Sequence, residues 1–345
     1  MAKESEHGEP AKRKITLSDI ARQVNVSTAT VSKVLNGRPG VSEETRSTIE
    51  MLLERSGYLK SNASQPPTKL IELVVRHLDN IWLLDLLRGA EEASRQHGIS
   101  IVITKVKDED ELADSWMSEV LERRPMGVII LFAVPSPSVS KRLASRGIPC
   151  VFLDPWGNPS NDTLSIRADN WSGSLFATRH LIELGHRRIG IITGPDTAMC
   201  SASRFDGYRA ALTEAGIPVD DSLIRKGIYQ VDSGREQALS LLADRSSNQP
   251  TAIVAGNDLQ AMGVYDAARL CGLRIPEDLS VVGFDDIQTA SYMGPALTTV
   301  RQPLEDMAAS AVRMILDRRE GHQVQETMIF PTSLVIRDST SKPRD

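Results

Sequence analysis

Residues 26–42 read VSTATVSKVLNGRPGVS, a stretch rich in small hydroxyl side chains that carries basic residues and no acid. Its apolar residues recur as on one face of a short helix, which leaves Thr28, Ala29, Ser32 and Lys33 on the outward face. Small hydroxyl and methyl groups let a helix lie close to DNA base edges, and a lysine donates to guanine or to phosphate. This chemistry favours a helix that contacts DNA.

The flanking residues predict the helices that position this face. Thr16 and Asp19 have the spacing of a capping box ahead of a first helix. Asn25 suits a left-handed turn, and Ser27 is placed to cap the second helix. Residues 42–57 read as a third, supporting helix. Two short helices joined by a tight turn are typical of a helix-turn-helix module, although a three-helix packing module that binds no DNA has the same outline.

The charge of the chain is unevenly distributed. Residues 12–38 hold six basic side chains and one acid, whereas the whole chain has a net charge of −5. A basic segment attached to an acidic body indicates a polyanionic partner for that segment alone. A solvated basic face is the alternative interpretation.

A second set of polar and aromatic side chains follows the apolar runs of residues 70–286. Carboxylates and an arginine fork hydrogen-bond hydroxyl groups, while flat aromatic rings cover the apolar faces of sugars. We therefore predict a site for a neutral polyhydroxylated ligand. Its predicted binding residues are Asp79, Trp82, Asp154, Cys200, Arg204, Tyr229, Asn257 and Asp285.

The apolar runs themselves predict the elements that hold this site. Runs such as IELVV, GVIILF, CVFLD and TAIVAG alternate with amphipathic segments, a pattern typical of buried parallel strands and helices in an α/β fold. The pattern restarts near Asp169, which indicates two similar sheets. Ligands of such open sheets lie at the carboxyl ends of the strands, where the predicted binding residues are found.

Several of these residues have plainer interpretations. Cys200 has the character of a small buried hydrophobe, and Arg204 could form a structural ion pair. We expect Asp258 to cap the helix that follows it and Asp286 to lie in a turn.

The stretch TLSDIARQVNVSTATVSKVLNGRPGVSEETR closely resembles the N-terminal domain of the LacI/GalR family of bacterial transcription repressors. The resemblance implies that Thr28, Ala29 and Lys33 read bases. The remaining DNA-binding or supporting residues that it implies are Leu17, Ser27, Thr30, Ser32, Asn36, Tyr58 and Asn62.

Later blocks, such as HLIELGHRRIGIITGP and IPEDLSVVGFDD, resemble the same family. The implied fold is a small all-α helix-turn-helix domain followed by an α/β periplasmic-binding-protein-like domain with two doubly wound parallel-sheet lobes. The expected divisions are a tail at 1–13, the DNA-binding domain at 14–60, a hinge at 61–69, the effector domain at 70–338 and a tail at 339–345. Within the effector domain we expect an N-lobe at about 70–166 and 297–327, and a C-lobe at about 167–296 and 328–338.

The hinge departs from the family pattern. Relatives carry a segment like Pro-Asn-Ala-x-Ala-Arg-x-Leu, whose leucine wedges into the minor groove. Here Asn62 and Ala63 remain, but no apolar wedge follows, and Pro66 and Pro67 would stop a helix. We expect the Pro-Pro pair to act as a stiff spacer.

Other classes of function find little support. Asp154 and Asp285 suggest a glycosidase with paired carboxylates, but no catalytic motif accompanies them. Three scattered cysteines show no metal-ligand spacing, and no cofactor is expected. A transport receptor would share the lobes, but we find no signal peptide or apolar span. We expect a cytoplasmic protein and no enzyme.

Together these observations predict a homodimeric, allosteric transcription repressor. Two helix-turn-helix heads would bind a pseudo-palindromic DNA operator. A small sugar between the lobes, for example a xylo- or cello-oligosaccharide, would change operator affinity.

Overall fold

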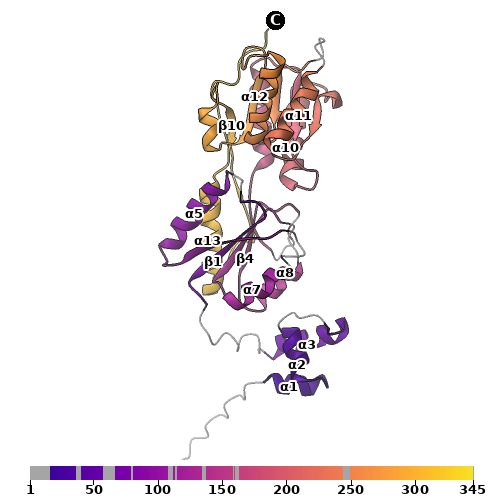
Figure 1. The fold of residues 1–345 in the computed structure, drawn as a ribbon, viewed down its shortest axis with the longest axis vertical. Helices are drawn as coiled ribbons and strands as arrows, with labels where there is room; N and C mark the ends of the chain where they lie inside the picture. The colour runs from indigo at the N-terminus through magenta and orange to yellow at the C-terminus, as the bar shows by residue number, and fades with distance from the viewer. Residues whose placement is uncertain are drawn as a thin grey trace, which may run out of the picture.

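The computed structural model describes residues 16–35, 40–56, 67–78, 81–107, 112, 115–133, 137–157, 159, 163–243 and 249–344. These residues form a three-helix head, residues 16–56, and two α/β lobes stacked along the long axis of the molecule (Figure 1). The predicted fold class is confirmed.

The head contains α1 (Leu17–Gln23), α2 (Thr28–Leu35) and α3 (Glu43–Arg55). The Thr16 hydroxyl accepts from the Asp19 amide, and the Asp19 carboxylate accepts in return from the Thr16 amide, which confirms the capping box. Asn25 has a φ of 55° and makes the left-handed turn between α1 and α2. The apolar faces of the three helices then meet in one small core of Ile20, Ala21, Val31, Val34, Ile49 and Leu53.

The first lobe is built on a six-stranded parallel sheet. Its strands are β1 (Leu70–Val75), β2 (Ser100–Lys105), β3 (Gly127–Leu131), β4 (Cys150–Leu153), β5 (Leu164–Ala168) and β11 (Thr327–Phe330), in the order β11-β5-β4-β3-β1-β2. Helices α5 (Leu83–Arg95) and α13 (Leu304–Glu320) pack on one face. Helices α7 (Ser115–Arg123) and α8 (Pro137–Ala144) cover the other.

The second lobe repeats this plan. Its strands are β6 (Ile189–Thr193), β7 (Ile224–Lys226), β8 (Ala252–Ala255), β9 (Ser280–Asp285), β10 (Thr298–Arg301) and β12 (Ser333–Val335), in the order β12-β10-β9-β8-β6-β7. Only β12 runs antiparallel to its neighbour among the paired strands of the described residues. Helices α9 (Asn170–Glu183) and α10 (Met199–Glu214) cover one face, and α11 (Val231–Leu242) and α12 (Asp258–Cys271) the other.

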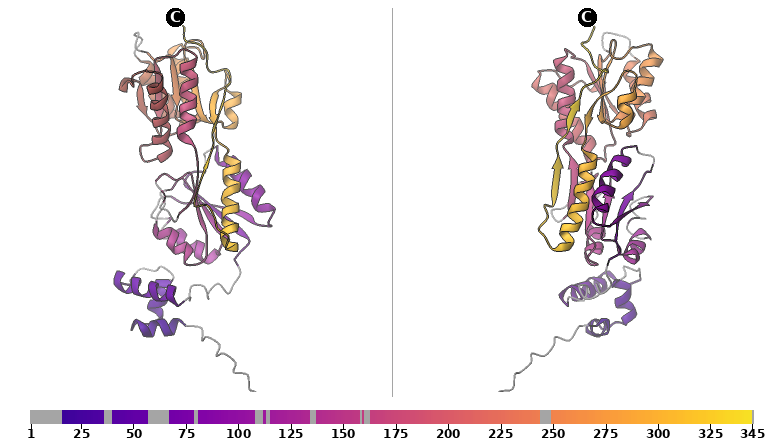
Figure 2. Two further views of the ribbon diagram at one scale, coloured as in Figure 1. Left: turned by 180° about the vertical axis from the view of Figure 1, so that it is seen from behind. Right: turned by 90° about the vertical axis from the view of Figure 1, so that its left-hand side faces the viewer.

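The chain crosses between the lobes three times, and each crossing lies a few residues beyond its predicted place. The crossings follow β5, β10 and β11 (Figure 2). Residues 167–168 therefore belong to the first sheet, 298–301 to the second, and 328–330 to the first again. The boundaries predicted at about 166, 297 and 327 fall a few residues short of these crossings, because an apolar strand looks alike in either sheet and only its pairing partner decides the lobe.

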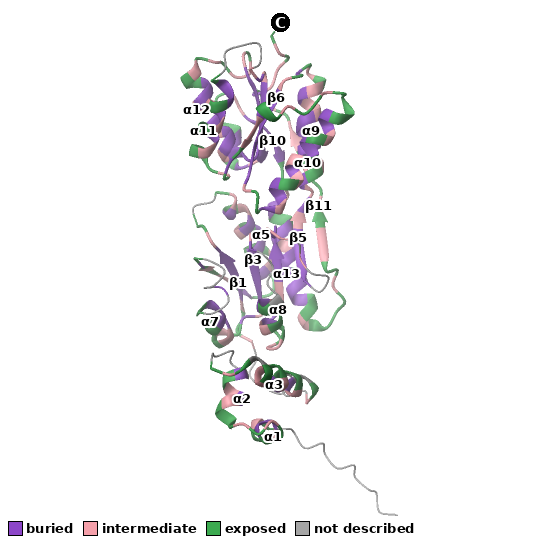
Figure 3. Ribbon diagram, turned by 90° about the vertical axis from the view of Figure 1, so that its right-hand side faces the viewer, coloured by how far each residue is buried: buried purple, intermediate pink, exposed green. Residues whose placement is uncertain are grey.

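Burial follows the layers. Figure 3 shows that the buried residues concentrate in the strands and on the inward faces of the helices in both lobes. No helix in the described ranges is long and apolar enough to span a membrane.

Candidate functional site

The second helix of the head presents the predicted polar face. Thr28, Ala29 and Lys33 on α2 are exposed, whereas Val31 and Val34 on the opposite side are buried. The first turn of α2 carries no acid, so the positive end of the helix dipole is not neutralised there. A face of this size and charge fits the phosphate-lined major groove of DNA.

Two of the predicted DNA-binding hydroxyls also hold the helix in place. The Ser27 Oγ accepts from the Thr30 amide at 3.0 Å and lies 2.8 Å from the Thr30 Oγ1. Leu17 is half-buried against the head's core. Ser32 is also half-buried on α2. The predicted residues Asn36, Tyr58 and Asn62 lie outside the described residues, as does Pro66 of the hinge.

A cavity of about 460 Å³ lies between the two lobes. It falls within the size range of small-molecule sites. Seven of the eight predicted ligand residues line it, and Asp79 lies outside the described residues. The seven are Trp82, Asp154, Cys200, Arg204, Tyr229, Asn257 and Asp285.

Arg204 is the most tightly held side chain of this cavity. It is 7% exposed, and its guanidinium lies 3.7 Å from the centre of the Phe284 ring. Its Nε donates to the Asn170 Oδ1 at 2.8 Å, and its Nη1 donates to the carbonyl of Gly256 at 2.6 Å. The remaining nitrogen, Nη2, lies 3.7 Å from the Asp285 Oδ1. These contacts fix the plane of the fork and leave one edge towards Asp285 and the cavity.

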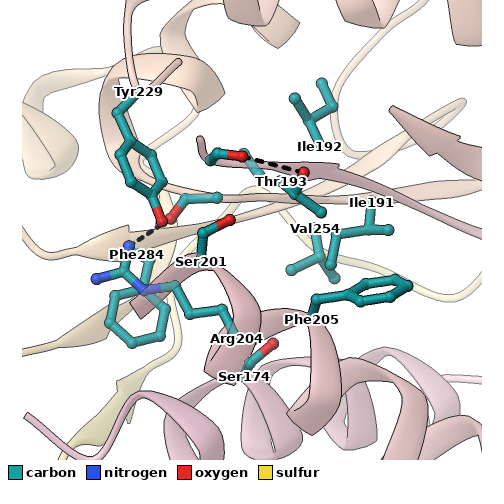
Figure 4. A pocket seen from close by; sticks show the side chains of 13 residues that line it. Ser174, Ile191, Ile192, Thr193, Ser201, Arg204, Phe205, Tyr229, Val254 and Phe284 are labelled. Carbon is teal, nitrogen blue, oxygen red and sulfur yellow. Dashed lines mark hydrogen bonds between the residues drawn. The ribbon is translucent and has the colours of Figure 1, made fainter. Parts of the chain in front are cut away.

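Figure 4 shows how Tyr229, Phe284 and Ser201 surround the guanidinium of Arg204. The space drawn there is a separate cavity of only about 10 Å³, which is at most the size of one water molecule. A larger ligand does not fit this small cavity, whereas the cavity between the lobes has room for one.

Two buried carboxylates approach Arg204 from different lobes. Asp154 follows β4 in the first lobe, and Asp285 ends β9 in the second. Burial raises the pKa of each to about 6, although the charge of Arg204 opposes the rise. The Asp285 Oδ1 also accepts from the Gln302 Nε2 at 2.7 Å. Buried carboxylates are poorly solvated by water, so hydrogen bonds from the hydroxyl groups of a ligand stabilise their charged form.

Backbone strain collects at the same place. Among the described residues, seven that are not glycine have a positive φ, and four of them line the cavity: Phe132, Asp154, Tyr229 and Asp285, with φ of 48–117°. Such conformations cost free energy and persist where the surroundings hold a side chain for a task. At Asp154 and Asp285 this backbone conformation occurs at the carboxyl ends of the strands and directs the polar side chains into the cleft.

Aromatic rings close two sides of the cavity. Trp82 packs against the cores of both lobes and meets Phe132 edge to face, with ring centroids 4.3 Å apart. Trp156 also lines the cavity, and the Arg76 guanidinium lies 5.7 Å from the centre of its ring. The backbone carbonyl of Trp156 accepts a hydrogen bond from the Met199 amide of the other lobe. The rings therefore border the polar groups of the cavity, as apolar and aromatic side chains do in small-molecule sites.

Sequence reasoning missed Gln302, Arg76 and Asn170, which line the cavity or hold its residues. Asn170 lies two residues after β5, at the start of α9. The rule that selected the other residues would therefore have reached it had that strand been predicted to end at 168. Gln302 lies on a crossing between lobes, where no strand pattern points to the cleft.

The prediction for Asp258 was wrong. Asn257 caps α12, because its side chain accepts from the Gln260 amide at 2.9 Å. Asp258 is instead fully buried and accepts from the Thr299 hydroxyl and the Ile287 amide. Asp286 pairs with Arg301 and Arg337. No group of three metal-ligating side chains occurs in the part of the chain that the structure describes.

Comparison with known proteins agrees with both sites. Residues 16–61 match the family described as bacterial regulatory proteins, lacI family, and residues 178–340 match the periplasmic binding protein-like domain. The HTH-type transcriptional repressor PurR of Salmonella paratyphi B is 34% identical over 309 residues, which cover 88% of this chain and 90% of the relative. The chain belongs to the lacI family of bacterial regulatory proteins.

Solved structures extend the likeness to nearly the whole chain. The transcriptional regulator CelR in complex with cellobiose has a TM-score of 0.72 and 30% identity, covering 94% of this chain and 99% of that one. The lac repressor dimer bound to operator and the anti-inducer ONPF has a TM-score of 0.71 and 26% identity, covering 95% and 100%. This lacI-family protein is a DNA-binding transcriptional repressor with a domain for a small-molecule effector, and regulators of the family act as dimers.

Proposed function

We propose that this repressor binds a neutral mono- or oligosaccharide between its lobes and that the sugar changes its affinity for a pseudo-palindromic operator. The observation that carries the proposal is the convergence of Asp154, Asp285 and Arg204 in one aromatic-bordered cavity. Carboxylates accept from sugar hydroxyls, and the guanidinium edge donates to ring or hydroxyl oxygens. The proposal needs no metal or prosthetic group, and it places the protein in the cytoplasm with the DNA that it regulates.

The charge balance of the cavity favours a neutral ligand. Asp154 and Asp285 are offset by Arg204 and Arg76, all of which line it. An anionic ligand would leave the two carboxylates facing another negative charge, which is unfavourable at low solvent exposure. The cellobiose held by the similar regulator CelR supports the same ligand class.

The lobes provide a route from ligand to DNA. Asp154 and Trp82 come from the first lobe, whereas Arg204, Tyr229 and Asp285 come from the second. A ligand that contacts both sets favours one angle between the lobes. The first lobe carries the hinge, so this angle changes the spacing of two heads in a dimer, and DNA must shift sugar affinity by the same factor.

Operator binding with and without sugars tests this proposal. Fluorescence anisotropy would measure binding of the full chain to DNA from upstream of its own gene, at fixed salt. The ligand panel contains cellobiose, xylobiose, glucose, glucose 6-phosphate and hypoxanthine. We expect a neutral sugar to change the Kd for DNA. A response to the phosphate ester or the purine base alone would contradict the sugar assignment.

A matched pair of variants on α10 locates the effect. Arg204→Ala removes the buried fork and should abolish the sugar response while DNA binding persists. Arg209→Ala removes an exposed arginine of the same helix, paired only loosely with Asp206 at 3.7 Å, and should respond like the parent. An unaltered response in Arg204→Ala would place the ligand elsewhere.

A further inference from the structure

The described part of the hinge is hydrogen-bonded to the first lobe at Thr68. This residue lies two positions before β1, and its amide donates to the Arg124 carbonyl at 3.0 Å. Its hydroxyl lies 2.8 Å from the Arg123 carbonyl oxygen and 3.0 Å from the Arg124 carbonyl oxygen, and it can donate to either. Both carbonyls stand at the end of α7, which lies at the same end of the lobe as the start of β1 (Figure 1). We call the contact between Thr68 and these two carbonyls the hinge clamp.

The backbone at the end of α7 has an unusual conformation where it meets Thr68. Arg124, directly after α7, has a φ of 48°, in the left-handed region that favours glycine. Its amide donates to the Val120 carbonyl at 2.9 Å, while its carbonyl accepts from Thr68. A residue other than glycine keeps such a conformation where its surroundings hold it. The contact with the hinge is one of the interactions that do so.

A buried carboxylate fixes the same end of α7 from inside the lobe. Glu72 on β1 is fully buried, and its carboxylate accepts from the Arg123 Nε at 3.1 Å and from the Arg123 Nη2 at 2.8 Å. It also accepts from the Thr104 hydroxyl on β2 at 2.6 Å and from the Trp116 Nε1 on α7 at 2.7 Å. Arg123 therefore connects the core to the hinge, because its guanidinium binds Glu72 while its carbonyl faces Thr68.

Stability alone does not account for the pair of Glu72 and Arg123. Replacement of a buried ion pair by apolar residues is often neutral or stabilising, because both ions lose their hydration on burial. The second lobe has an apolar strand at the equivalent place. Its strand β6 is the neighbour of β7 and β8 as β1 is of β2 and β3, and it reads IGIIT with no charged side chain. The charged link thus belongs to the lobe that carries the hinge.

We propose that Thr68 is a positioning residue for operator binding. The end of α7, which Glu72 and Arg123 hold in place, clamps Thr68 and so fixes the point from which the hinge leaves the first lobe. In a dimer, two such points set the separation of the two heads, and the protein discriminates between operators whose half-sites differ in spacing. The inference rests on the two-fold operator of the proposed function and does not depend on the identity of the effector.

Operators of altered spacing test the hinge clamp in the full chain. Footprinting on the upstream duplex defines the two half-sites, and one base pair is then inserted or removed between them. Fluorescence anisotropy without sugar measures the Kd for each duplex, and we expect the parent to bind the natural spacing most tightly. Thr68→Val keeps the shape of the side chain but has no hydroxyl. It should reduce the ratio of Kd values between altered and natural spacing by about fivefold, as expected for one lost hydrogen bond.

Two further variants control for effects on folding. Thr68→Ser keeps the hydroxyl and should retain the parental ratio. Thr213→Val is a matched control, because the Thr213 hydroxyl also donates to a backbone carbonyl, that of Arg209 at 2.9 Å, on the surface of the second lobe. It should retain the parental ratio as well. A Thr68→Val protein that binds all duplexes more weakly by one common factor would show a merely structural role and overturn the proposal.

A duplex with one half-site separates the hinge clamp from the head. Parent and Thr68→Val should bind this duplex equally, because the head itself is unchanged. A footprint without two related half-sites would contradict the two-fold operator and overturn the hinge clamp with it. Two half-sites whose spacing the parent tolerates would overturn the hinge clamp alone.

A double-mutant cycle tests the link through Arg123. Arg123→Lys removes the bidentate fork on Glu72 and should lower the spacing ratio in the same direction as Thr68→Val. Because both changes act on one contact, the double variant should lose less than the product of the two single effects. Thermal melting verifies that each variant is folded at the temperature of the titration. Independent effects of the two changes would overturn the role of Arg123 in the hinge clamp.

Discussion

At the scale of single residues, Arg204 combines a structural and a binding task. Two of its nitrogens are committed to Asn170 and Gly256 within the second lobe, and the third faces Asp285. An arginine fork that is already ordered loses little entropy when a ligand binds to its free edge. The same ordering explains why lysine, a flexible point charge, would be a poor replacement.

The two buried carboxylates predict a pH dependence of effector binding. Asp154 and Asp285 have pKa values raised to about 6 by burial. Hydroxyl donors of a sugar favour the charged carboxylates, so binding should release protons, and affinity should rise as pH increases from about 5 to 7. Titration calorimetry in two buffers of different ionisation enthalpy measures this release. Affinity that is constant over the range would contradict the expectation.

The same carboxylates lower stability as pH rises. Their folded pKa values lie above the ordinary 3.8, so the folded chain holds protons that the unfolded chain has lost. The free energy of unfolding should therefore fall between about pH 4 and pH 6 by this contribution. Asp154→Asn should flatten that part of the stability curve in urea titrations, whereas the exposed control Asp206→Asn should leave it unchanged.

At the scale of elements, α2 depends on a cap made by Ser27, a residue at its predicted DNA-contacting end. Ser27→Ala removes the acceptor for the Thr30 amide, and loss of such a cap costs about 1 kcal/mol. We expect a lower melting temperature of the head and weaker binding to every DNA sequence. Ser47→Ala, on the exposed side of α3, is the matched control. Specificity that changes while stability stays constant would show that Ser27 reads DNA without supporting the helix.

Close packing of α5 on α13 gives a second prediction at this scale. A Cβ added at Gly89 would lie 2.1 Å from the Glu305 carbonyl oxygen, so the two helices would have to move apart. Gly89→Ala should lower the free energy of unfolding by roughly 1–3 kcal/mol, as overpacking does. Urea unfolding measures the change, with the exposed Glu91→Ala as control. A neutral Gly89→Ala would mean that α13 shifts without cost.

Local patterns predicted the head well, because each of its signals acts within a few residues. Thr16, Asp19, Asn25 and Ser27 occupy their predicted positions. The cleft residues were predicted where a polar side chain follows a strand. Gln302 was missed because its contact with Asp285 is set by a crossing between lobes, and Asp258 was misassigned because Asn257, one residue earlier, takes the cap. Long-range pairing has no signature in a single segment.

At the scale of the whole molecule, the chain passes between the two lobes three times, and both lobes line one cavity. Trp82 contacts both cores, and the Trp156 carbonyl bonds to Met199 across the cleft. These contacts hold the two lobes in the arrangement described here. A ligand that bridges Asp154 and Arg204 would stabilise this arrangement.

The assembly in solution is a prediction at the same scale. A two-fold operator requires two heads, so light scattering should give twice the chain mass of 37.8 kDa. A mass near four subunits would contradict the expected dimer. A mass of one chain would contradict the dimer.

The three crossings have a consequence for synthesis of the protein. The first lobe lacks α13 and β11 until residues 304–330 have left the ribosome, so the apolar face under α13 stays uncovered for most of translation. The head, made first, has no such requirement. Discontinuous lobes of this kind finish folding late and expose apolar surface until their last segments have been synthesised. A frameshift just after Arg301 would therefore prevent both lobes from completing their folds. The first lobe would lose α13 and β11, and the second would lose β12, although residues 1–301 would be unchanged.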